Sequence, residues 1–241
     1  MPREACSQNR PQTARDAFKM FEERLEAGEH SPYKHRLTDR ERWEGFKRMI
    51  DDRGIRYARC TLENFTCTTG RQREVVELLR QFFADLPRHL TETIGGGLVL
   101  FGQPGTGKDH LLAACLREAI LEHGFRVRWS DGIRMYHCIK AAISTNTTEE
   151  VIGDLVKPQI LAISDPLPPN AELTGYELGC LRDIVDRRYS RGLSTWITTN
   201  VQNPEEAKER LTSALLGRLL DNAVEVMCDW EGYRRPFTKV S

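Results

Sequence analysis

The residues best suited to chemistry form a glycine-rich run in the middle of the chain, Gly102-Gln103-Pro104-Gly105-Thr106-Gly107-Lys108-Asp109. Except at its last position, this run has the pattern of a phosphate-binding loop. In such a loop the glycines allow backbone N–H groups to surround a phosphate, and the side chain of Lys108 reaches the β- and γ-phosphates. An ordinary glycine-rich turn would not explain Lys108, so the run predicts a binding site for a nucleoside triphosphate.

The last position of the loop departs from the motif. A Ser or Thr hydroxyl normally ligates Mg²⁺ there, whereas this chain has Asp109. A carboxylate is a good ligand for Mg²⁺, but without the ion it would face phosphate oxygens of the same sign. The substitution therefore predicts that nucleotide binding depends unusually strongly on Mg²⁺. The alternative is that Asp109 only caps the helix that follows.

A second acidic residue, Asp165, ends the apolar run Ile160-Leu161-Ala162-Ile163-Ser164. This is typical of a Walker B strand, whose carboxylate holds Mg²⁺ at the carboxyl edge of a parallel sheet. The next position usually carries a glutamate that polarises the attacking water, but here it is Pro166. Because proline has no carboxylate, hydrolysis should be slow or should use another acid. Glu172 and Glu177 in the following segment are the candidates.

Two further polar residues accompany apolar segments. Asn200 follows the run Ser194-Thr195-Trp196-Ile197-Thr198-Thr199 and is either a turn-forming residue or a sensor between Asp165 and the γ-phosphate. Arg218 lies within otherwise mostly apolar residues 211–220 and needs an anionic partner. It either pairs with an acid such as Asp221 or projects across a subunit boundary as an arginine finger. Lys108, Asp165, Asn200 and Arg218 form the predicted catalytic set, and Asp109 and Asp165 are the predicted metal ligands.

The elements that must position these residues alternate along the chain. Strands are predicted over residues 97–101, 127–130, 159–165, 194–200 and 223–229, and helices over 110–123, 132–144, 176–190 and 204–220. Such alternation indicates an α/β fold with a parallel sheet covered by helices on both faces. Asp165 and Asn200 then lie at strand ends, where ligands of such folds gather.

The first 55 residues are polar, charged and helix-prone, with helices predicted over residues 13–27 and 38–52. A further helix is predicted over residues 71–86. Apolar residues recur at helical spacing in the first two helices, at Phe18, Phe21, Leu25, Trp43, Phe46 and Ile50. This narrow stripe either packs on the main domain or binds a partner. The predicted division is a helical, partner-binding region over residues 1–55 and an ATP-binding domain over residues 56–241.

Length and composition narrow the possible classes of protein. A chain of 241 residues suits one α/β domain plus an appendage. The 35 Lys and Arg residues balance 35 Asp and Glu residues, so contact with nucleic acid requires a local basic face. The seven cysteines contain no CxxC pair and indicate free thiols, with a zinc site from Cys60, Cys67 and a histidine as the alternative. Without a signal core or a long apolar stretch, a cytoplasmic location with no membrane partner is expected.

In their order, these motifs resemble the AAA+ ATPases, and among them the branch containing the helicase loader DnaC and the transposition helper IstB. The resemblance covers roughly residues 54–241. It rests on Gly54-Ile55-Arg56, Leu62-Glu63-Asn64-Phe65, the loop from Gly102 to His110, Val185-Asp186-Arg187-Arg188-Tyr189, Thr198-Thr199-Asn200, Leu215-Leu216-Gly217-Arg218-Leu219-Leu220 and Gly232-Tyr233-Arg234. It implies a P-loop core with a five-stranded parallel sheet and no separate lid domain.

The resemblance also implies a ligand and a site. ATP and Mg²⁺ would be bound by the loop up to and including His110. The nucleotide would lie between subunits of a homo-oligomer, so that Arg218 would act on the nucleotide of a neighbouring subunit.

The function implied is helicase loading in DNA replication, with weak ATP hydrolysis. Loaders of this branch bind the replicative DNA helicase through a small N-terminal domain, and bind ATP and single-stranded DNA through the core. The alternatives are a transposition helper, which contacts a transposase and duplex DNA, and an adaptor that does not hydrolyse nucleotide.

Residues that would contact DNA phosphates are Arg126, Arg128, Arg134 and Lys140, with Trp129 and Tyr136 placed among them to stack on bases. The alternative is a solvated face with core aromatics.

Overall fold

Five parallel strands form the centre of the molecule, in the order β2-β3-β4-β1-β5. The computed structural model describes residues 19, 20, 23, 31–93, 95–168, 171–201 and 204–233. The strands are β1 (Leu98–Gly102), β2 (Val127–Asp131), β3 (Ile160–Ser164), β4 (Ser194–Thr199) and β5 (Val224–Cys228). The predicted parallel sheet is confirmed, and each strand agrees with its predicted range to within one residue at either end.

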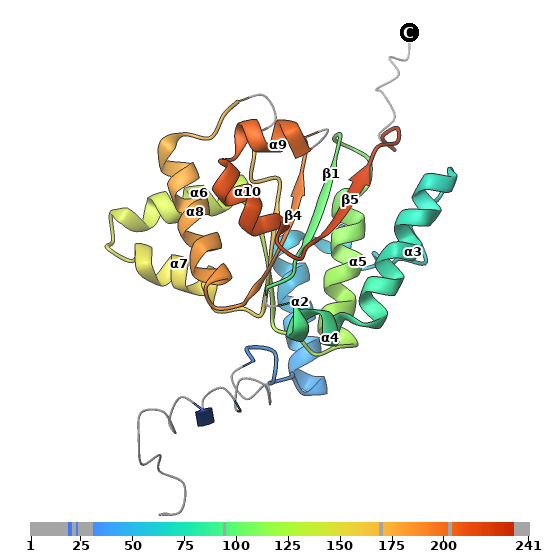
Figure 1. Ribbon diagram of the computed structural model, residues 1–241, viewed down its shortest axis with the longest axis horizontal. Helices are drawn as coiled ribbons and strands as arrows, with labels where there is room; N and C mark the ends of the chain where they lie inside the picture. Colours follow the sequence, from blue (N-terminus) through green and yellow to red (C-terminus); the bar gives the residue numbers. More distant parts are fainter. Residues whose placement is uncertain are drawn as a thin grey trace, which may run out of the picture.

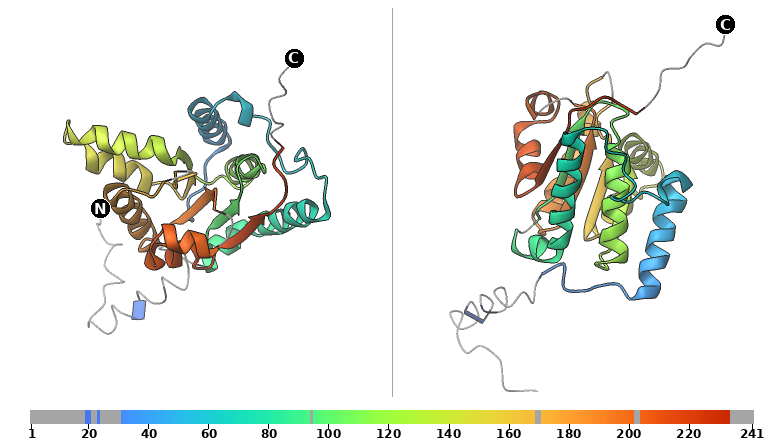
Figure 2. Two further views of the ribbon diagram at one scale, coloured as in Figure 1. Left: turned by 90° about the horizontal axis from the view of Figure 1, so that it is seen from above. Right: turned by 90° about the vertical axis from the view of Figure 1, so that its right-hand side faces the viewer.

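Helices cover both faces of the sheet (Figure 1). One face carries α2 (Asp39–Arg53), α3 (Gly70–Ala84), α4 (Leu86–Glu92) and α5 (Lys108–Leu121). The other carries α6 (Gly132–Ile143), α7 (Thr148–Val156), α8 (Gly175–Tyr189), α9 (Pro204–Arg210) and α10 (Ser213–Leu220). Figure 2 shows α5 and α10 on opposite sides of the strands.

Alternate residues of β1, β3, β4 and β5 supply the two hydrophobic cores, whereas β2 contributes to one of them only. In β1, Leu98 and Leu100 pack with α3 and α5, whereas Val99 and Phe101 pack with the helices of the other face. All five residues of β1 are buried, as expected for a central strand covered on both sides. The phosphate-binding loop therefore begins at the end of a fully buried strand.

Two predicted helices are interrupted. Residues 204–220 form α9 and α10, because the side chain of Thr212 accepts a hydrogen bond from Leu215 N and starts a new helix. The helix predicted over residues 71–86 ends at Ala84, and the short helix α4, with Pro87 in its first turn, follows. Helix α7 has no counterpart in the predictions, because its nine residues are shorter than the window over which helical periodicity is read.

Residues 31–53 pack against the core. Helix α2 buries Phe46, Met49 and Ile50 in the same core as α5. Ahead of it, the buried Tyr33 donates a hydrogen bond to Gly192 O (2.9 Å), and Gln159 Nε2 donates to Pro32 O (2.8 Å). Phe46 and Ile50 of the predicted stripe thus pack on the main domain, whereas Trp43 is 63% exposed. The division at residue 55 stays a prediction. The helix predicted over residues 13–27 falls almost wholly outside the described residues.

Within the part of the chain that the structure describes, no helix has the length and apolar character needed to cross a membrane.

Candidate nucleotide-binding site

The glycine-rich loop connects β1 to α5 at the carboxyl edge of the sheet. Gly105 and Gly107 have φ values of 92° and 91°, which favour glycine because other residues are strained there. Gly107 also has no room for a side chain, since a Cβ would lie 2.7 Å from Phe65 Cε2. Gln103 and Pro104 at the tip of the loop are exposed, whereas Thr106 is buried and its hydroxyl donates to Gln103 O (2.9 Å).

Lys108 is the first residue of α5, and its side chain is buried. Its Nζ donates hydrogen bonds to Gly102 O (2.7 Å), Gln103 O (2.9 Å) and Asn200 Oδ1 (3.0 Å). These contacts fix the ammonium between the loop and the end of β4. The start of a 14-residue helix adds partial positive charge at the same place.

Asp165 follows β3 and lies next to this ammonium. Burial and the negative charge of Asp109 raise the pKa of Asp165 to about 6, although Lys108 and a hydrogen bond from Asn200 act in the opposite direction. Its Oδ1 is buried and has no hydrogen-bond partner among the described residues. A buried carboxylate oxygen of this kind is a suitable ligand for a cation.

The side chain of Asp109 points toward the same region. Its Oδ1 accepts a hydrogen bond from Thr198 Oγ1 (3.2 Å), and its Oδ2 accepts a long one from Tyr57 OH (3.5 Å). The same Thr198 hydroxyl accepts a hydrogen bond from the backbone N–H of Asp165 (3.3 Å). Thr198 therefore joins the two predicted metal ligands, and its position in a buried Thr-Thr-Asn run is the sequence signal for it.

The chemistry of these donors fits Mg²⁺. The ion prefers one or two carboxylates together with phosphate oxygens and water, rather than a cage made only of protein groups. Among the described residues, no group of three or more His, Cys, Asp or Glu side chains is arranged to hold a metal. Two carboxylates beside a phosphate-binding loop are consistent with a metal that arrives with its nucleotide. Nothing in the described residues supports the zinc site considered for Cys60 and Cys67, both of which are free thiols.

His110 lies on the outer side of the loop. Its Nε2 is hydrogen-bonded to Thr61 O (3.0 Å), and its ring packs edge-on against Phe65 at 5.4 Å between centroids. The side chain thus contacts the segment that enters the core. A direct role for His110 in phosphate binding stays a prediction.

The position after Asp165 is closely packed. Pro166 is buried, its carbonyl accepts a hydrogen bond from Tyr136 OH (3.2 Å), and a Cβ on Gly132 would lie 2.3 Å from its Cα. The carboxylate of Glu177 accepts hydrogen bonds from the N–H and hydroxyl of Thr174 (2.9 and 2.8 Å) and completes the capping box of α8. Glu177 is therefore engaged in capping a helix, whereas Glu172 is exposed.

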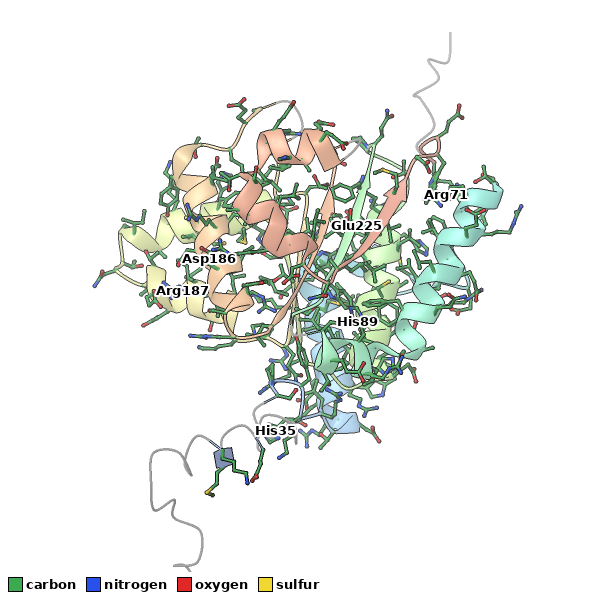
Figure 3. All side chains as sticks on the ribbon, in the orientation of Figure 1. His35, Arg71, His89, Asp186, Arg187 and Glu225 are labelled. Atoms are coloured by element: carbon green, nitrogen blue, oxygen red, sulfur yellow. The ribbon has the colours of Figure 1, made fainter. Side chains whose placement is uncertain are left out.

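Arg218 pairs with an acid of the same chain. Its guanidinium contacts Asp186 on α8, labelled in Figure 3, and Asp186 also pairs with Arg182 at 3.6 Å. Asp221, the acid considered from the sequence, instead accepts a hydrogen bond from Tyr189 OH (2.7 Å). The anionic partner of Arg218 is thus one helix away.

Arg218 lies away from the phosphate-binding loop of the chain. A Cβ on Gly97, directly before β1, would lie 3.8 Å from Leu219 O. The end of α10 therefore lies at the start of β1, and it leads into the start of β5 (Figure 1). The loop follows the other end of β1. The structure brings Lys108, Asp109, Asp165 and Asn200 together at the carboxyl ends of the strands. It leaves Arg218 at their amino ends.

Arg188 is a buried residue that sequence reasoning missed. Its guanidinium is fully buried and donates hydrogen bonds to the carbonyls of Leu155, Val156, Pro158, Gln159 and Ser194 and to Thr195 Oγ1. Burial lowers its pKa to about 9. Arg188 holds the connection between α7 and β3 against the start of β4. Helical spacing is the signal that could have found it, because Arg188 follows Leu181, Ile184 and Val185 on the buried face of α8.

The predicted base-stacking role of Trp129 and Tyr136 is wrong. They are 4% and 3% exposed, and the indole N–H of Trp129 donates to Ser164 Oγ (2.6 Å). Both are core aromatics, which confirms the alternative interpretation of these two residues. The four basic side chains are exposed, but they are spread over three pockets: Arg126 and Arg128 line one, Arg128 and Arg134 a second, and Lys140 a third.

The pocket beside Lys140, on the outer side of α6, contains an exposed aromatic. It has a volume of about 390 Å³ and is also lined by His137, Ile143 and Tyr176. The side chain of Tyr176, at the start of α8, is 42% exposed.

Comparison with known proteins agrees with this geometry. The chain is 28% identical over 235 residues to the replicative helicase loader DnaC of Escherichia coli (strain K12). The aligned residues cover 95% of this chain and 92% of that protein. The crystal structure of the DnaC helicase loader matches with a TM-score of 0.63 at 20% identity, over 72% of this chain and 99% of that one.

A further match is the replication initiator DnaA bound to AMPPCP and single-stranded DNA, with a TM-score of 0.56 at 20% identity, over 69% of this chain and 49% of that chain. The two structures show the fold, an AAA+ core. A family model described as IstB-like ATP binding protein matches residues 63–240, which confirms the predicted branch: the chain belongs to the IstB-like ATP-binding protein family.

Proposed function

We propose that this protein loads a replicative DNA helicase onto DNA during replication, in the cytoplasm, and that bound ATP controls its assembly with DNA and helicase. The observation that carries the proposal is the contact of Asn200 with both Lys108 and Asp165 at the mouth of the phosphate-binding loop. Similarity to a named helicase loader over nearly the whole chain gives the process.

In this proposal the chain's own residues hold the nucleotide. The loop N–H groups and Lys108 bind the β- and γ-phosphates, and Asn200 orients Lys108 against Asp165. Asp109 and Asp165 would hold Mg²⁺, which would neutralise phosphate charge when bound. Hydrolysis is slow, because the buried Pro166 supplies no carboxylate to activate water.

Assembly of several subunits completes the site. Arg218 lies at the sheet edge opposite the loop, so it reaches the γ-phosphate only of a neighbouring subunit. In its ion pair with Asp186, both side chains are about one-third exposed. Little free energy is therefore lost when Arg218 leaves Asp186 for a phosphate.

Single-stranded DNA binds across the outer side of α6. Lys140 supplies a cation for phosphates, and the exposed ring of Tyr176 supplies a surface for bases. Trp129 does not line this pocket, and Tyr136 lines it from the core with only 3% of its side chain exposed.

The helicase binds the N-terminal region, residues 1–55. The described part of this region presents two exposed apolar side chains, Trp43 at 63% and Ile55 at 82%. Apolar residues so exposed suit a protein partner.

The test is reconstitution of loading with the replicative helicase of the same cell. Purified helicase, this protein and circular single-stranded DNA are mixed with ATP, with ADP or without nucleotide, and helicase retained on the DNA is measured. The proposal predicts retention that requires this protein and ATP. Retention that is the same without this protein would reject it.

A transposition helper remains the second candidate, because the family model carries the IstB description. It predicts ATP-dependent binding to duplex DNA in preference to single strands, and no effect on helicase retention. A nucleotide-dependent adaptor predicts neither.

A further inference from the structure

The segment that follows β5 lies against the phosphate-binding loop. We call residues 229–233 the strap. The indole N–H of Trp230 donates to Thr106 O (2.8 Å), and the backbone N–H of Tyr233 donates to Gly105 O (2.8 Å). The strap and the loop are more than 120 residues apart in the sequence, so this contact is a product of the fold.

The strap is itself held by the entry to the core. Tyr233 OH donates to Thr66 O and accepts a hydrogen bond from the buried Gln72 Nε2 (2.8 Å). Asp229 pairs with Arg71 at 3.5 Å, and Arg71 lies at the start of α3 in Figure 3. Both ends of the strap are therefore fixed to α3 and the segment before it.

Aromatic rings fill the space between strap and loop. Phe65 packs edge-on against Trp230 (6.3 Å between centroids) and Tyr233 (5.8 Å). A Cβ on Gly107 would meet Phe65 at 2.7 Å and Tyr233 Cε2 at 3.3 Å. A Cβ on Gly232 would likewise lie 3.2 Å from Pro104 O. The outer side of the loop is thus covered closely by the strap and Phe65.

These contacts determine where two phosphate donors point. The carbonyl of one residue and the N–H of the next belong to one planar peptide unit and point in opposite directions. A hydrogen bond that fixes Gly105 O therefore also fixes the direction of Thr106 N–H. In the same way, the bond from Trp230 to Thr106 O fixes Gly107 N–H. In a phosphate-binding loop such N–H groups surround the anion.

We infer that the strap, through Trp230 and Tyr233, holds the phosphate-binding loop in its anion-binding conformation before nucleotide arrives. Trp230 and Tyr233 are positioning residues in this account. The inference rests on the proposed nucleotide binding and adds that the affinity for phosphate groups depends on residues from the C-terminal end of the domain.

Trp230→Phe is the direct test, because it keeps an aromatic ring and removes the indole donor. Binding of Mg·ADP, inorganic pyrophosphate with Mg²⁺, and adenosine is measured by calorimetry, together with the melting temperature. Without the indole donor, Gly107 N–H is no longer held toward the phosphates. The affinities for ADP and pyrophosphate should therefore fall by a similar factor, about five- to tenfold, and the affinity for adenosine should not change. Tyr189→Phe, which removes an aromatic hydrogen-bond donor on α8, is the control and should leave the affinities for ADP and pyrophosphate unchanged.

Tyr233→Phe provides a second variant on a partly exposed side chain. It removes the hydroxyl that ties the strap to Thr66 and Gln72, and it should weaken the same two ligands to a smaller extent. A lower melting temperature with unchanged affinity would mean a structural role only and would overturn the inference. Loss of ADP and adenosine affinity with pyrophosphate unchanged would indicate contact with the base and would also overturn it. Absence of binding by the wild-type protein would reject the proposed function and this inference together.

Discussion

The side chain of Asn200 joins Lys108 to Asp165. Its oxygen accepts a hydrogen bond from Lys108 Nζ at 3.0 Å, and its amide donates to the Asp165 carboxylate. Three residues from separate parts of the chain thus meet at one edge of the sheet. An amide suits this position because it can accept from a cation and donate to an anion at the same time.

The raised pKa of Asp165, about 6, makes stability depend on pH. Because the folded protein binds this proton more tightly than the unfolded chain does, the stabilisation is complete below about pH 4 and is lost as pH rises through about 6. Asp165→Asn removes the titration. It should be more stable than wild type by about 2 kcal/mol at pH 8 and equally stable near pH 4.

Urea denaturation without nucleotide or Mg²⁺ at the two pH values checks this. Asp154→Asn, at an exposed acid on α7, is the control for replacing a carboxylate by an amide away from the site. A stability difference for Asp165→Asn that is the same at both pH values would contradict the assignment of the titration.

Asp109 should make nucleotide binding unusually dependent on Mg²⁺. Without the ion its carboxylate faces the phosphates, so affinity for ADP should fall about 100-fold in excess EDTA. Asp109→Ser restores the usual hydroxyl and should reduce this loss to about tenfold or less. Calorimetric titration of ADP with Mg²⁺ and with EDTA gives the comparison. Equal binding by the wild-type protein in both buffers would refute the role of Asp109 and favour simple helix capping.

Arg218→Ala should impair turnover or ATP-dependent assembly and leave the monomer folded. The pair with Asp186 is partly exposed, so its loss should cost about 1 kcal/mol or less in the free energy of unfolding. Arg182→Ala removes the other partner of Asp186 and is the matched control. Turnover and sedimentation with ATP should change only in the Arg218 variant. Unfolding of the Arg218→Ala monomer would instead assign a structural role.

The surface formed by Lys140 and Tyr176 should carry DNA affinity. Tyr176→Ala should weaken binding of a fluorescent single-stranded oligonucleotide by about tenfold, as expected for loss of one stacked base. Lys140→Ala should weaken binding and flatten its dependence on salt concentration, because one phosphate contact is lost. Tyr189→Ala is the control, since Tyr189 lies on the same helix and is almost equally exposed, at 41% against 42%. Equal losses for Tyr176→Ala and Tyr189→Ala would remove this surface from the account.

Local patterns made much of the nucleotide site predictable. The loop and its lysine are read within eight residues, and Asp165 and Asn200 each end an apolar run, so parallel strands must bring them to one edge. Contacts between distant segments could not be read in this way. The bonds of Tyr57 to Asp109 and of Trp230 to Thr106 depend on how the entry segment and the chain end cross the loop.

The prediction for Trp129 failed for a simpler physical reason. Trp129 and Arg128 are adjacent in β2, and adjacent strand residues point to opposite faces of a sheet. Arg128 is therefore exposed, whereas Trp129 packs in the core with α2 and α5. Tyr136 belongs instead to the buried stripe of α6 with Met135 and Ile139.

Lys108, Asn200 and Asp165 should together form an ATP site. Calorimetric titration with Mg·ATP compares the wild-type protein with Lys108→Ala and Asn200→Ala, with Gln81→Ala as a surface amide control. We expect saturable binding by the wild type and the control, a loss of about tenfold for Asn200→Ala, and a loss of about 100-fold or more for Lys108→Ala. Equal affinity of all four proteins for Mg·ATP, or no binding by the wild type, would contradict this assignment.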